Sequence, residues 1–383
     1  MQEIRFGIIG LGNMGSTHAR SLLEGKVPRA VLGAVCDLNP QATARFPGIP
    51  AFTDVESIIG SGRVDAILVT TPHFSHTPIG IAALQAGLHV LVEKPISVHK
   101  ADCERLLAAY RPGRQVFGAM FNQRTDPLYA RLRELIQKGE LGAVRRIQWT
   151  VTNWFRTQAY YDSGGWRATW SGEGGGVLLN QCPHNLDLWQ WLFGMPDQVR
   201  AFVQTGRYHE IEVEDDVTAY FSYHDGAHGV FITSTGEAPG TNRLEVATEQ
   251  GRIVVENNQL SFTRNEVPMS KFSKTAPGGF DRPPTWDIAI PLNAGGTQHN
   301  GILSNFVSAI LDGAPLLAPA IEGINSVELA NAMLLSSFEN ETISLPLHSA
   351  RYEKFLLRKI SESKAKPAVA VAQVADLSKS FNR

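Results

Sequence analysis

The chain has few cysteines, almost no net charge and no long apolar run, and each shortage excludes a class of protein. Its three cysteines are too few and too scattered for a disulfide framework or a zinc site. A net charge of −2 leaves no electrostatic footprint for nucleic acid. No apolar run approaches the roughly 20 residues that span a bilayer. Since no signal-peptide pattern precedes Arg5, we expect a cytoplasmic protein without membrane or nucleic-acid partners and without a bound metal.

What the chain has is length and an ordinary apolar content. Its 383 residues are enough for two domains, and 43% apolar with 19% charged residues is typical of a globular protein. The pattern of apolar and polar residues changes near residue 122, and this change divides the chain. We predict a nucleotide-binding domain over 1–122, a substrate-binding and oligomerisation domain over 123–350, and a C-terminal tail over 351–383.

The first domain alternates short apolar runs with helical patterns, which predicts βαβ units and a doubly wound parallel sheet of the α/β class. The predicted strands are continuous Val/Ile/Leu runs, as expected when both faces of a sheet are buried. They are Ile4–Ile9, Ala30–Cys36, Ala66–Thr70, His89–Val92 and Val116–Met120. The predicted helices include His18–Leu23 and Pro78–Ala86.

Beyond residue 122 the apolar residues alternate with polar ones, which predicts an antiparallel or mixed sheet with one solvated face. Asp225-Gly226 is a hairpin signal between two of its strands. The predicted strands are Val144–Asn153, Gln198–Gln204, Val217–Tyr223, Gly229–Ser234 and Arg243–Ala247. Helices are predicted over Pro127–Lys138, Asn300–Asp312 and Ala320–Ser336.

The segment Gly10-Leu11-Gly12-Asn13-Met14-Gly15 follows the first predicted strand and opens a helix. In this context a GxGxxG pattern indicates a dinucleotide site, because the glycines allow a tight turn, close approach of the pyrophosphate and close helix–strand packing. The helix N-terminus then binds the phosphates. We predict that Gly10, Gly12, Asn13, Met14 and Gly15 contact the cofactor; the alternative is a chance glycine turn.

Asp37 ends the next predicted strand, about 20 residues further on, where an acid accepts hydrogen bonds from the adenosine ribose. Its carboxylate would repel a 2′-phosphate, and neither Leu38 nor Asn39 supplies a compensating cation. We therefore predict NAD rather than NADP. The alternative is an aspartate that caps a helix or turn.

Thr71, Pro72 and His73 follow another parallel strand, at the carboxyl edge where open α/β sheets bind ligands. We expect them to border the nicotinamide side of the crevice, with His76 as a weaker candidate. A surface histidine is an equal alternative for His73.

Glu93-Lys94-Pro95 ends the following strand at the same edge. A lysine near the positively charged nicotinamide has a depressed pKa and donates well to a substrate oxygen. Glu93 would accept from the ribose or the backbone, and Pro95, in the cis or trans form, would fix the turn. A surface Glu-Lys pair before a proline turn is the alternative.

A second constellation runs from three glycines, Gly174–Gly176, into an apolar helical pattern. The glycines allow close backbone approach. On a helix, Asn180, His184 and Asp187 share one face, and histidine is the side chain best suited to take a hydroxyl proton near neutral pH. A structural histidine is the common alternative, and metal binding is disfavoured because ligand partners are missing nearby.

With these motifs the chain resembles the Gfo/Idh/MocA oxidoreductase family, which includes glucose–fructose oxidoreductase and inositol dehydrogenases. The resemblance runs from about residue 4 to 350 and rests on the glycine fingerprint with His18 after it, Glu93-Lys94-Pro95 and the glycine-rich segment before His184. It implies a Rossmann domain followed by an α+β domain with a large open, mostly antiparallel sheet that often forms subunit interfaces. A homodimer or homotetramer is therefore expected.

The resemblance also implies roles for single residues. Lys94 and His184 would be the catalytic pair, with His184 as general base and Lys94 holding the substrate hydroxyl. The remaining residues that it implies fall into two groups. Near the cofactor they are Gln123, Trp166 and Arg167, and near the substrate Arg156 and Tyr161.

Asn180 is a departure, because many members have an aspartate four residues before the histidine. An amide still positions a hydroxyl or the imidazole, but it does not raise the basicity of the histidine as a carboxylate would. Asp187 is the carboxylate that remains for this task. The departure puts an inositol substrate in more doubt than the enzyme class.

The function predicted from the sequence is an NAD-dependent dehydrogenase that oxidises a secondary hydroxyl of a sugar, sugar derivative or cyclitol. One alternative is an NAD-dependent glycoside hydrolase, which oxidises its substrate transiently and shows no net reduction of NAD. A second is a non-catalytic sensor that binds NAD or sugar, which Lys94 and His184 argue against.

Overall fold

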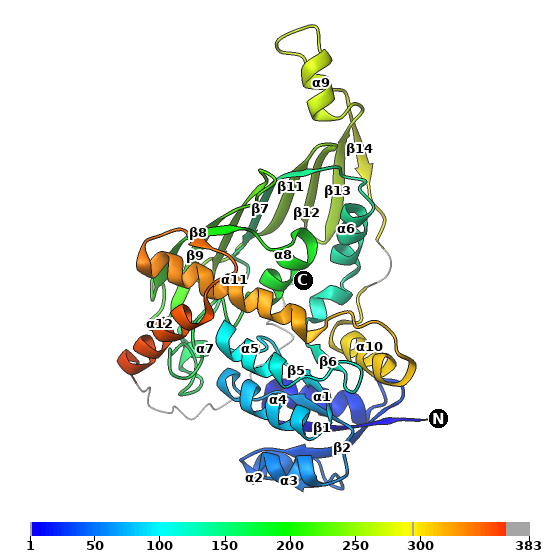
Figure 1. Ribbon diagram of the computed structural model, residues 1–383, viewed down its shortest axis with the longest axis vertical. Coiled ribbons are helices and arrows are strands. Elements are labelled where there is room, and N and C mark those ends of the chain that lie inside the picture. Colours follow the sequence, from blue (N-terminus) through cyan, green and yellow to red (C-terminus); the bar gives the residue numbers. More distant parts are fainter. Residues whose placement is uncertain (1, 293–294, 365–383) are drawn as a thin grey trace.

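The structure is a computed structural model that describes residues 2–292 and 295–364. It contains two sheets, one above the other along the long axis of the molecule (Figure 1). Residues 4–119 form most of the lower part, and the strands that follow residue 143 form the upper part.

The first sheet has six parallel strands in the order β3-β2-β1-β4-β5-β6, a doubly wound arrangement that confirms the predicted fold class. The strands are β1 (Ile4–Ile9), β2 (Ala30–Cys36), β3 (Ala51–Phe52), β4 (Ala66–Val69), β5 (His89–Val92) and β6 (Phe117–Ala119). The helices between them are α1 (Asn13–Leu23), α2 (Pro40–Thr43), α3 (Val55–Gly60), η1 (His73–Ser75), α4 (His76–Gln85) and α5 (Lys100–Ala108).

The second sheet has nine strands in the order β14-β13-β12-β11-β7-β10-β9-β8-β15. Only β7 and β10 pair in parallel, so the sheet is mixed and mostly antiparallel. The first five strands are β7 (Val144–Val151), β8 (Gln198–Thr205), β9 (Glu214–Ser222), β10 (His228–Ser234) and β11 (Asn242–Thr248). The other four, which the sequence reading missed, are β12 (Gly251–Glu256), β13 (Gln259–Asn265), β14 (Thr285–Ala289) and β15 (Ile343–Ser344).

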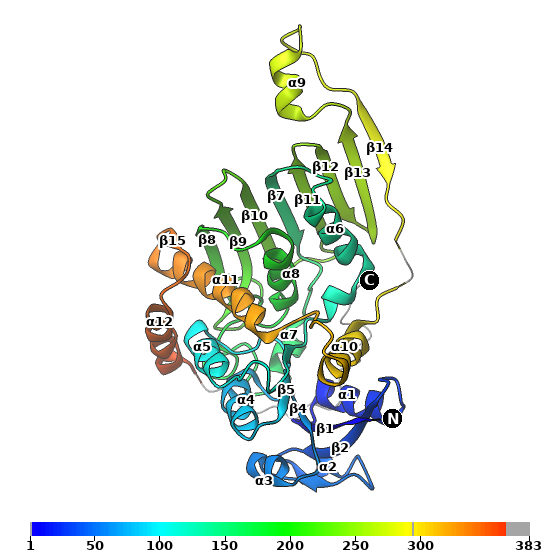
Figure 2. The same cartoon turned by 45° about the vertical axis from the view of Figure 1, so that its right-hand side comes forward.

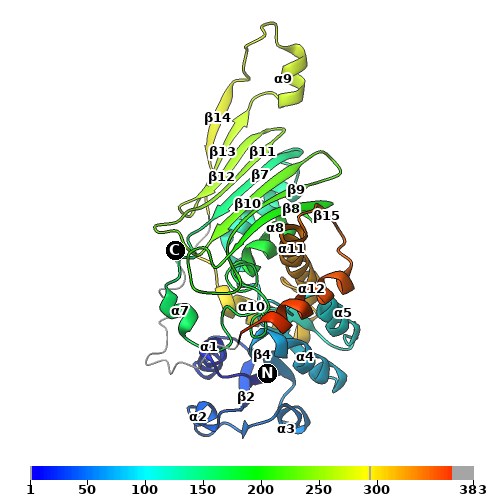
Figure 3. The same cartoon turned by 90° about the vertical axis from the view of Figure 1, so that its left-hand side faces the viewer.

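Helices cover one face of this sheet (Figures 2 and 3). The chain passes from β6 through η2 (Asn122–Thr125) into α6 (Pro127–Gln137), and α8 (Pro183–Phe193) and α11 (Ala320–Glu339) complete the layer. The short helix α7 (Gln158–Asp162) lies in the long connection between β7 and α8. At the far end, α9 (Met269–Thr275) stands away from the body and has no buried residue (Figure 2).

The chain returns to the first sheet after the second is complete. Helix α10 (Gln298–Asp312) contributes Leu303, Phe306 and Val307 to the core that surrounds the parallel strands. Helix α12 (Ser349–Glu362) covers much of the described part of the predicted tail, and Tyr352 is fully buried there. The rest of that segment, residues 365–383, lies outside the described residues.

Candidate active site

The glycine turn between β1 and α1 has the geometry of a phosphate-binding loop. Gly10 has φ +94°, a conformation that favours glycine, and a Cβ on Gly15 would lie 1.9 Å from the Gly10 carbonyl oxygen. Gly12 caps α1 without a side-chain hydrogen bond, so the first N–H groups of the helix remain available. These features fit the pyrophosphate of a dinucleotide.

Asp37 lies beside this turn. Its Oδ2 accepts a hydrogen bond of 2.6 Å from the Leu11 N–H, and its Oδ1 accepts one from the Asn39 N–H. The half-buried carboxylate is thus held where a ribose would follow the phosphates. The sequence reading missed Arg45, whose guanidinium donates to the Leu11 carbonyl and brings a cation to the same turn.

The predicted crevice residues meet at the carboxyl edge of β4 and β5. The ring nitrogens of the buried His76 each lie 2.8 Å from a carbonyl oxygen, Nδ1 from that of Pro95 and Nε2 from that of Thr71. His76 therefore ties the two strand ends together. His73 is also buried, and its Nδ1 contacts the Glu173 carbonyl oxygen at 3.3 Å. The surface alternative for His73 is thereby excluded.

A buried pair joins the glycine helix to the lysine motif. His18 Nε2 on α1 contacts Glu93 Oε1 at 2.8 Å. Burial alone would raise the pKa of Glu93, but the hydrogen bond with His18 and the surrounding charges lower that pKa to about 2. Glu93 is therefore a carboxylate at neutral pH, and the peptide bond from Lys94 to Pro95 is cis.

Lys94 follows strand β5 of the first sheet, but its side chain is hydrogen-bonded to a residue of the second part of the chain. Its Nζ donates to the backbone carbonyl of Asn180 at 2.8 Å. Burial, reinforced by the positive charges of Arg156 and Arg167 and opposed by Glu93 and Glu173, lowers the pKa of Lys94. An ammonium with three donors that uses one of them on a carbonyl can offer the others to a substrate oxygen.

The predicted close backbone approach is found at Gly176, whereas a side chain on Gly174 or Gly175 would meet neighbouring side chains. A Cβ on Gly176 would lie 2.0 Å from the Glu214 carbonyl oxygen, and one on Gly174 would lie 2.1 Å from Val98. Glu214, on β9, anchors the segment because its carbonyl accepts from the Val177 N–H and its Oε1 from the Leu178 N–H.

His184 is buried on α8, and its Nδ1 has no hydrogen-bond partner among the described residues. Burial, together with the positive charge of Lys94, lowers the pKa of His184 well below its usual value. The ring packs edge-on against Phe121, with centroids 6.4 Å apart. A neutral imidazole with an unpartnered nitrogen is suited to accept a proton.

Two details of the predicted helix face need correction. Helix α8 begins at Pro183, so Asn180 lies in the turns before it and not on the helix. Asp187 is on α8, but its carboxylate accepts from the Arg124 Nε and Nη2 at 2.8 and 2.6 Å. Asp187 therefore fixes α8 against η2, and it is not the carboxylate that serves His184.

A different carboxylate, missed in the sequence, contacts Asn180. The Asn180 Nδ2 donates to Glu173 Oε1, and Glu173 Oε2 accepts from the Ala168 N–H at 2.7 Å. Glu173 is only 2% exposed, and burial raises its pKa. Its position directly before the three glycines was the only signal in the sequence.

The polar and aromatic residues before the glycines form one cluster. The Arg167 Nη1 donates to the Tyr160 hydroxyl at 2.9 Å, and its guanidinium lies over the Trp166 ring at 4.6 Å. The Trp166 ring in turn contacts His73. The Tyr161 hydroxyl instead lies 2.7 Å from Thr235 Oγ1 in the core, so Tyr160 is the tyrosine that belongs to this cluster.

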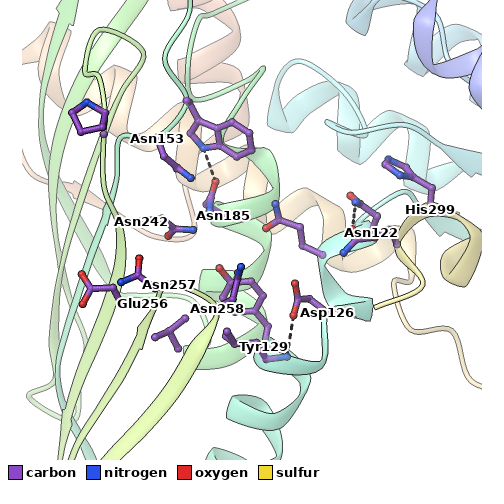
Figure 4. A pocket seen from close by; sticks show the side chains of 17 residues that line it. Asn122, Asp126, Tyr129, Asn153, Asn185, Asn242, Glu256, Asn257, Asn258 and His299 are labelled. Atoms are coloured by element: carbon purple, nitrogen blue, oxygen red, sulfur yellow. Dashed lines mark hydrogen bonds between the residues drawn. The ribbon is translucent and has the colours of Figure 1, made fainter. Parts of the chain in front are cut away.

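Arg156 contacts this cluster, and Gln123 lines a separate pocket. The Arg156 Nη1 donates to the Phe155 carbonyl at 2.9 Å, and its guanidinium lies over the Tyr160 ring at 5.2 Å. Gln123, on η2, lines a pocket of about 690 Å³ beside the site (Figure 4).

The structure also bears on metal and membrane binding. Over residues 2–292 and 295–364, no group of three or more His, Cys, Asp or Glu side chains is placed to hold a metal ion. None of the helices in these ranges is long and apolar enough to cross a bilayer.

Comparison with known proteins agrees with this geometry. The family profile described as "Oxidoreductase family, NAD-binding Rossmann fold" matches residues 4–119, and "GFO/IDH/MocA C-terminal domain" matches residues 129–254. The inositol 2-dehydrogenase of Rhizobium meliloti (strain 1021) is 25% identical over 358 residues, which cover 89% of this chain and 99% of that protein. The levoglucosan dehydrogenase of Pseudarthrobacter phenanthrenivorans is 24% identical and covers 91% and 100%.

Among solved structures, the WlbA dehydrogenase of Bordetella pertussis in complex with NADH and UDP-GlcNAcA has a TM-score of 0.76. It is 26% identical and covers 90% of this chain and 100% of that chain. The two profile matches confirm the resemblance of the sequence motifs. The chain belongs to the GFO/IDH/MocA oxidoreductase family, and its first domain is the NAD(H)-binding Rossmann fold of that family.

Proposed function

We propose that this protein is an NAD-dependent dehydrogenase that oxidises a secondary hydroxyl of a sugar, sugar derivative or cyclitol. The observation that carries the proposal is the placement of two groups at the carboxyl edge of the first sheet. Lys94 Nζ is fixed by a carbonyl 2.8 Å away, and a buried His184 with an unpartnered Nδ1 follows four residues after that carbonyl. The inositol and levoglucosan dehydrogenases among the relatives support this substrate class.

The residues present fit NAD. The glycine turn and the N-terminus of α1 would bind its pyrophosphate, and Asp37 its adenosine ribose. Thr71, His73 and the Trp166–Arg167 pair would border its nicotinamide half. When bound, NAD⁺ supplies the acceptor for a hydride.

In the proposed reaction, His184 takes the proton of the substrate hydroxyl. Its lowered pKa keeps the imidazole neutral at pH 7, as a base must be. Lys94 donates a hydrogen bond to the same oxygen and stabilises the negative charge that develops there, an effect that is usually large in a site shielded from water.

Asn180 acts in this proposal through both its backbone and its side chain. Its carbonyl orients Lys94, and its amide lies between Glu173 and the Tyr160 hydroxyl. Glu173 thus supplies near Lys94 the negative charge that an aspartate at 180 would have carried. We propose Glu173 as a positioning residue for this pair.

The test is NADH formation by wild type and Lys94→Ala over aldoses, anhydrosugars, glycosides and inositols. We expect Lys94→Ala to lower kcat by at least about a hundred-fold, the size of losing one donor to a developing oxyanion, with NADH binding retained. Lys26→Ala, at an exposed lysine, is the matched control.

In the same assay Glu173→Gln should shift the basic limb of the pH–rate profile to lower pH, because it removes a charge that raises the pKa of Lys94.

Two outcomes would contradict the proposal. Cleavage of a glycoside without net NADH would indicate transient oxidation followed by elimination. Binding of NADH and sugar without any chemistry would indicate a sensor.

A further inference from the structure

A pocket of about 690 Å³ lies beside the reacting groups and is larger than one hydroxyl-bearing carbon needs. Its walls come from η2 and the start of α6, from α8, from the start of α10, and from the turn between β12 and β13 (Figure 4). The pocket therefore extends from the domain junction to the inner side of the second sheet.

Side-chain amides dominate the lining. Asn153, Asn185, Asn242, Asn257 and Asn258 line it together with others, and Figure 4 shows them on the side of the second sheet and α8, with Asn122 on the opposite side. Each amide has two donors and an acceptor, which match hydroxyl groups that donate and accept in turn.

Indole N–H groups orient two of these amides. The Trp154 Nε1 donates to Asn185 Oδ1 at 3.2 Å, and the Trp149 Nε1 donates to Asn242 Oδ1 at 3.1 Å. These bonds engage the amide oxygens, and the Asn242 side chain also hydrogen-bonds the hydroxyl of Tyr129 in the same lining, so both amides are held in fixed orientations.

The opposite wall supplies acceptors. The Asn122 Nδ2 donates to Gln298 Oε1 at 2.7 Å, while the Asn122 Oδ1 is buried without a partner among the described residues. Asn122 is only 3% exposed. The Gln123 Oε1 beside it is buried and unpartnered in the same sense. Buried acceptors of this kind are satisfied by ordered water or by a donor from a ligand.

The charges of the lining disfavour an anion. Among the described residues that line the pocket there is no lysine or arginine, and two carboxylates, Asp126 and Glu256, are present. Asp126 caps α6, and Glu256 pairs with the Arg243 Nη1 at 2.6 Å. Burial lowers the pKa of His299 to about 4, so this ring adds no positive charge at pH 7. Phosphates and carboxylates are bound most strongly by Arg and Lys, which this lining lacks.

The pocket lies next to residues that contact or neighbour the reacting groups. His299 lines it, and its ring centroid is 5.5 Å from that of His18, which pairs with Glu93 next to Lys94. Asn185 directly follows His184 on α8. A ligand in the pocket thus borders the place where the hydroxyl would react.

We propose that the substrate is a neutral glycoside or oligosaccharide, one ring of which is oxidised between Lys94 and His184 while a second, uncharged sugar unit occupies the amide pocket. This inference rests on the proposed dehydrogenase function. One C–H hydride passes to NAD⁺ and one hydroxyl proton to His184, so that a ketone forms and the glycosidic bond stays intact.

The test compares glucose, methyl glucoside, cellobiose, maltose, trehalose and UDP-glucose, with NADH formation as the readout. We expect kcat/KM for at least one disaccharide to exceed that for glucose and for UDP-glucose. Asn242→Ala should lower the disaccharide value about three- to ten-fold, the size of one lost hydrogen bond, and leave the glucose value unchanged. Asn265→Ala, on β13 but outside the pocket, is the matched control.

A second readout does not need turnover: calorimetric binding of each sugar to the protein loaded with NADH. The pocket is supported if a disaccharide binds more tightly than glucose and if Asn242→Ala weakens that binding. If this result is obtained but no NADH forms, only the proposed dehydrogenase function fails. Equal turnover and equal binding of glucose and all disaccharides, or a preference for UDP-glucose, would overturn the inference and leave a dehydrogenase.

Discussion

Asp37 and Arg45 show how two side chains of opposite charge meet at the same turn. The Leu11 N–H donates to Asp37, and the Leu11 carbonyl accepts from Arg45. In the proposed cofactor site Asp37 would accept ribose hydroxyls and repel a 2′-phosphate, whereas Arg45 would attract one. The choice between NAD and NADP therefore depends on the carboxylate.

We predict that wild type binds NADH more tightly than NADPH and that Asp37→Ala loses this preference. Removal of the carboxylate ends the repulsion and leaves Arg45 to pair with the phosphate, a charge-assisted contact typically equivalent to about ten-fold or more in affinity. Quenching of protein fluorescence measures both dissociation constants. Asp281→Ala, on the loop after α9, is the control, and equal affinities in both wild type and variant would contradict the assignment to Asp37.

At the scale of elements, the parallel strands were the easiest to predict. Continuous apolar runs gave β1, β2 and β5 with the same ends as in the structure. The strands β12 to β14 were missed because their short apolar patterns are interrupted by polar residues. Each is completed by pairing with the strand before it, β12 with β11, β13 with β12 and β14 with β13. Helix α12 had a visible signal, since Tyr352, Phe355 and Leu356 follow helical spacing and are all buried.

Residues of the candidate site could be predicted where a short sequence motif specifies its own local geometry. They were harder to predict where a contact between two side chains arises only from tertiary packing. Pro183 favours the first position of a helix, which explains why Asn180 precedes α8. The contact of Glu173 with Asn180 and that of Arg124 with Asp187 depend on tertiary packing. No spacing in the sequence gives either pair.

Glu214 connects the glycine segment to β9 and makes stability depend on pH. The side chain is fully buried, its Oε2 is unpartnered among the described residues, and burial raises its pKa from 4.5 to about 7. The folded state thus binds a proton that the unfolded state releases above pH 4.5. The raised pKa of Glu214 therefore stabilises the folded state at low pH, and this stabilisation is lost as the pH rises from 4.5 to about 7.

We predict that Glu214→Gln, which does not titrate, gains stability relative to wild type between pH 4.5 and pH 7. Relative to wild type, the free energy of unfolding of Glu214→Gln should rise by on the order of 3 kcal/mol between pH 4.5 and pH 7. Urea unfolding at pH 5 and pH 8 measures it, with the exposed Glu140→Gln as control. The same pH dependence in Glu214→Gln as in wild type would show that Glu214 is not the group responsible.

At the scale of the whole molecule, the second sheet has helices on one face only (Figure 3). On the strands β8 and β9, Phe202 and Tyr220 are 60% and 47% exposed. Large exposed aromatic side chains on adjacent strands are typical of an interaction surface. Together with the expectation from the family, this supports a homodimer or homotetramer that uses the open face.

We predict that the double variant Phe202→Glu/Tyr220→Glu lowers the molar mass measured by light scattering, because charges on a self-complementary interface repel each other. Leu357→Glu on α12, whose leucine is also 60% exposed, is the matched control. A monomeric wild type, or a variant with unchanged mass, would contradict this role for the sheet.

The bond from Lys94 to the Asn180 carbonyl joins the end of a strand in one half of the protein to a turn in the other. The ammonium is therefore correctly aimed only while the two halves are docked, and it reports on their relative position. In the proposed reaction, docking of the two halves and placement of Lys94 for the substrate oxygen would therefore be a single event.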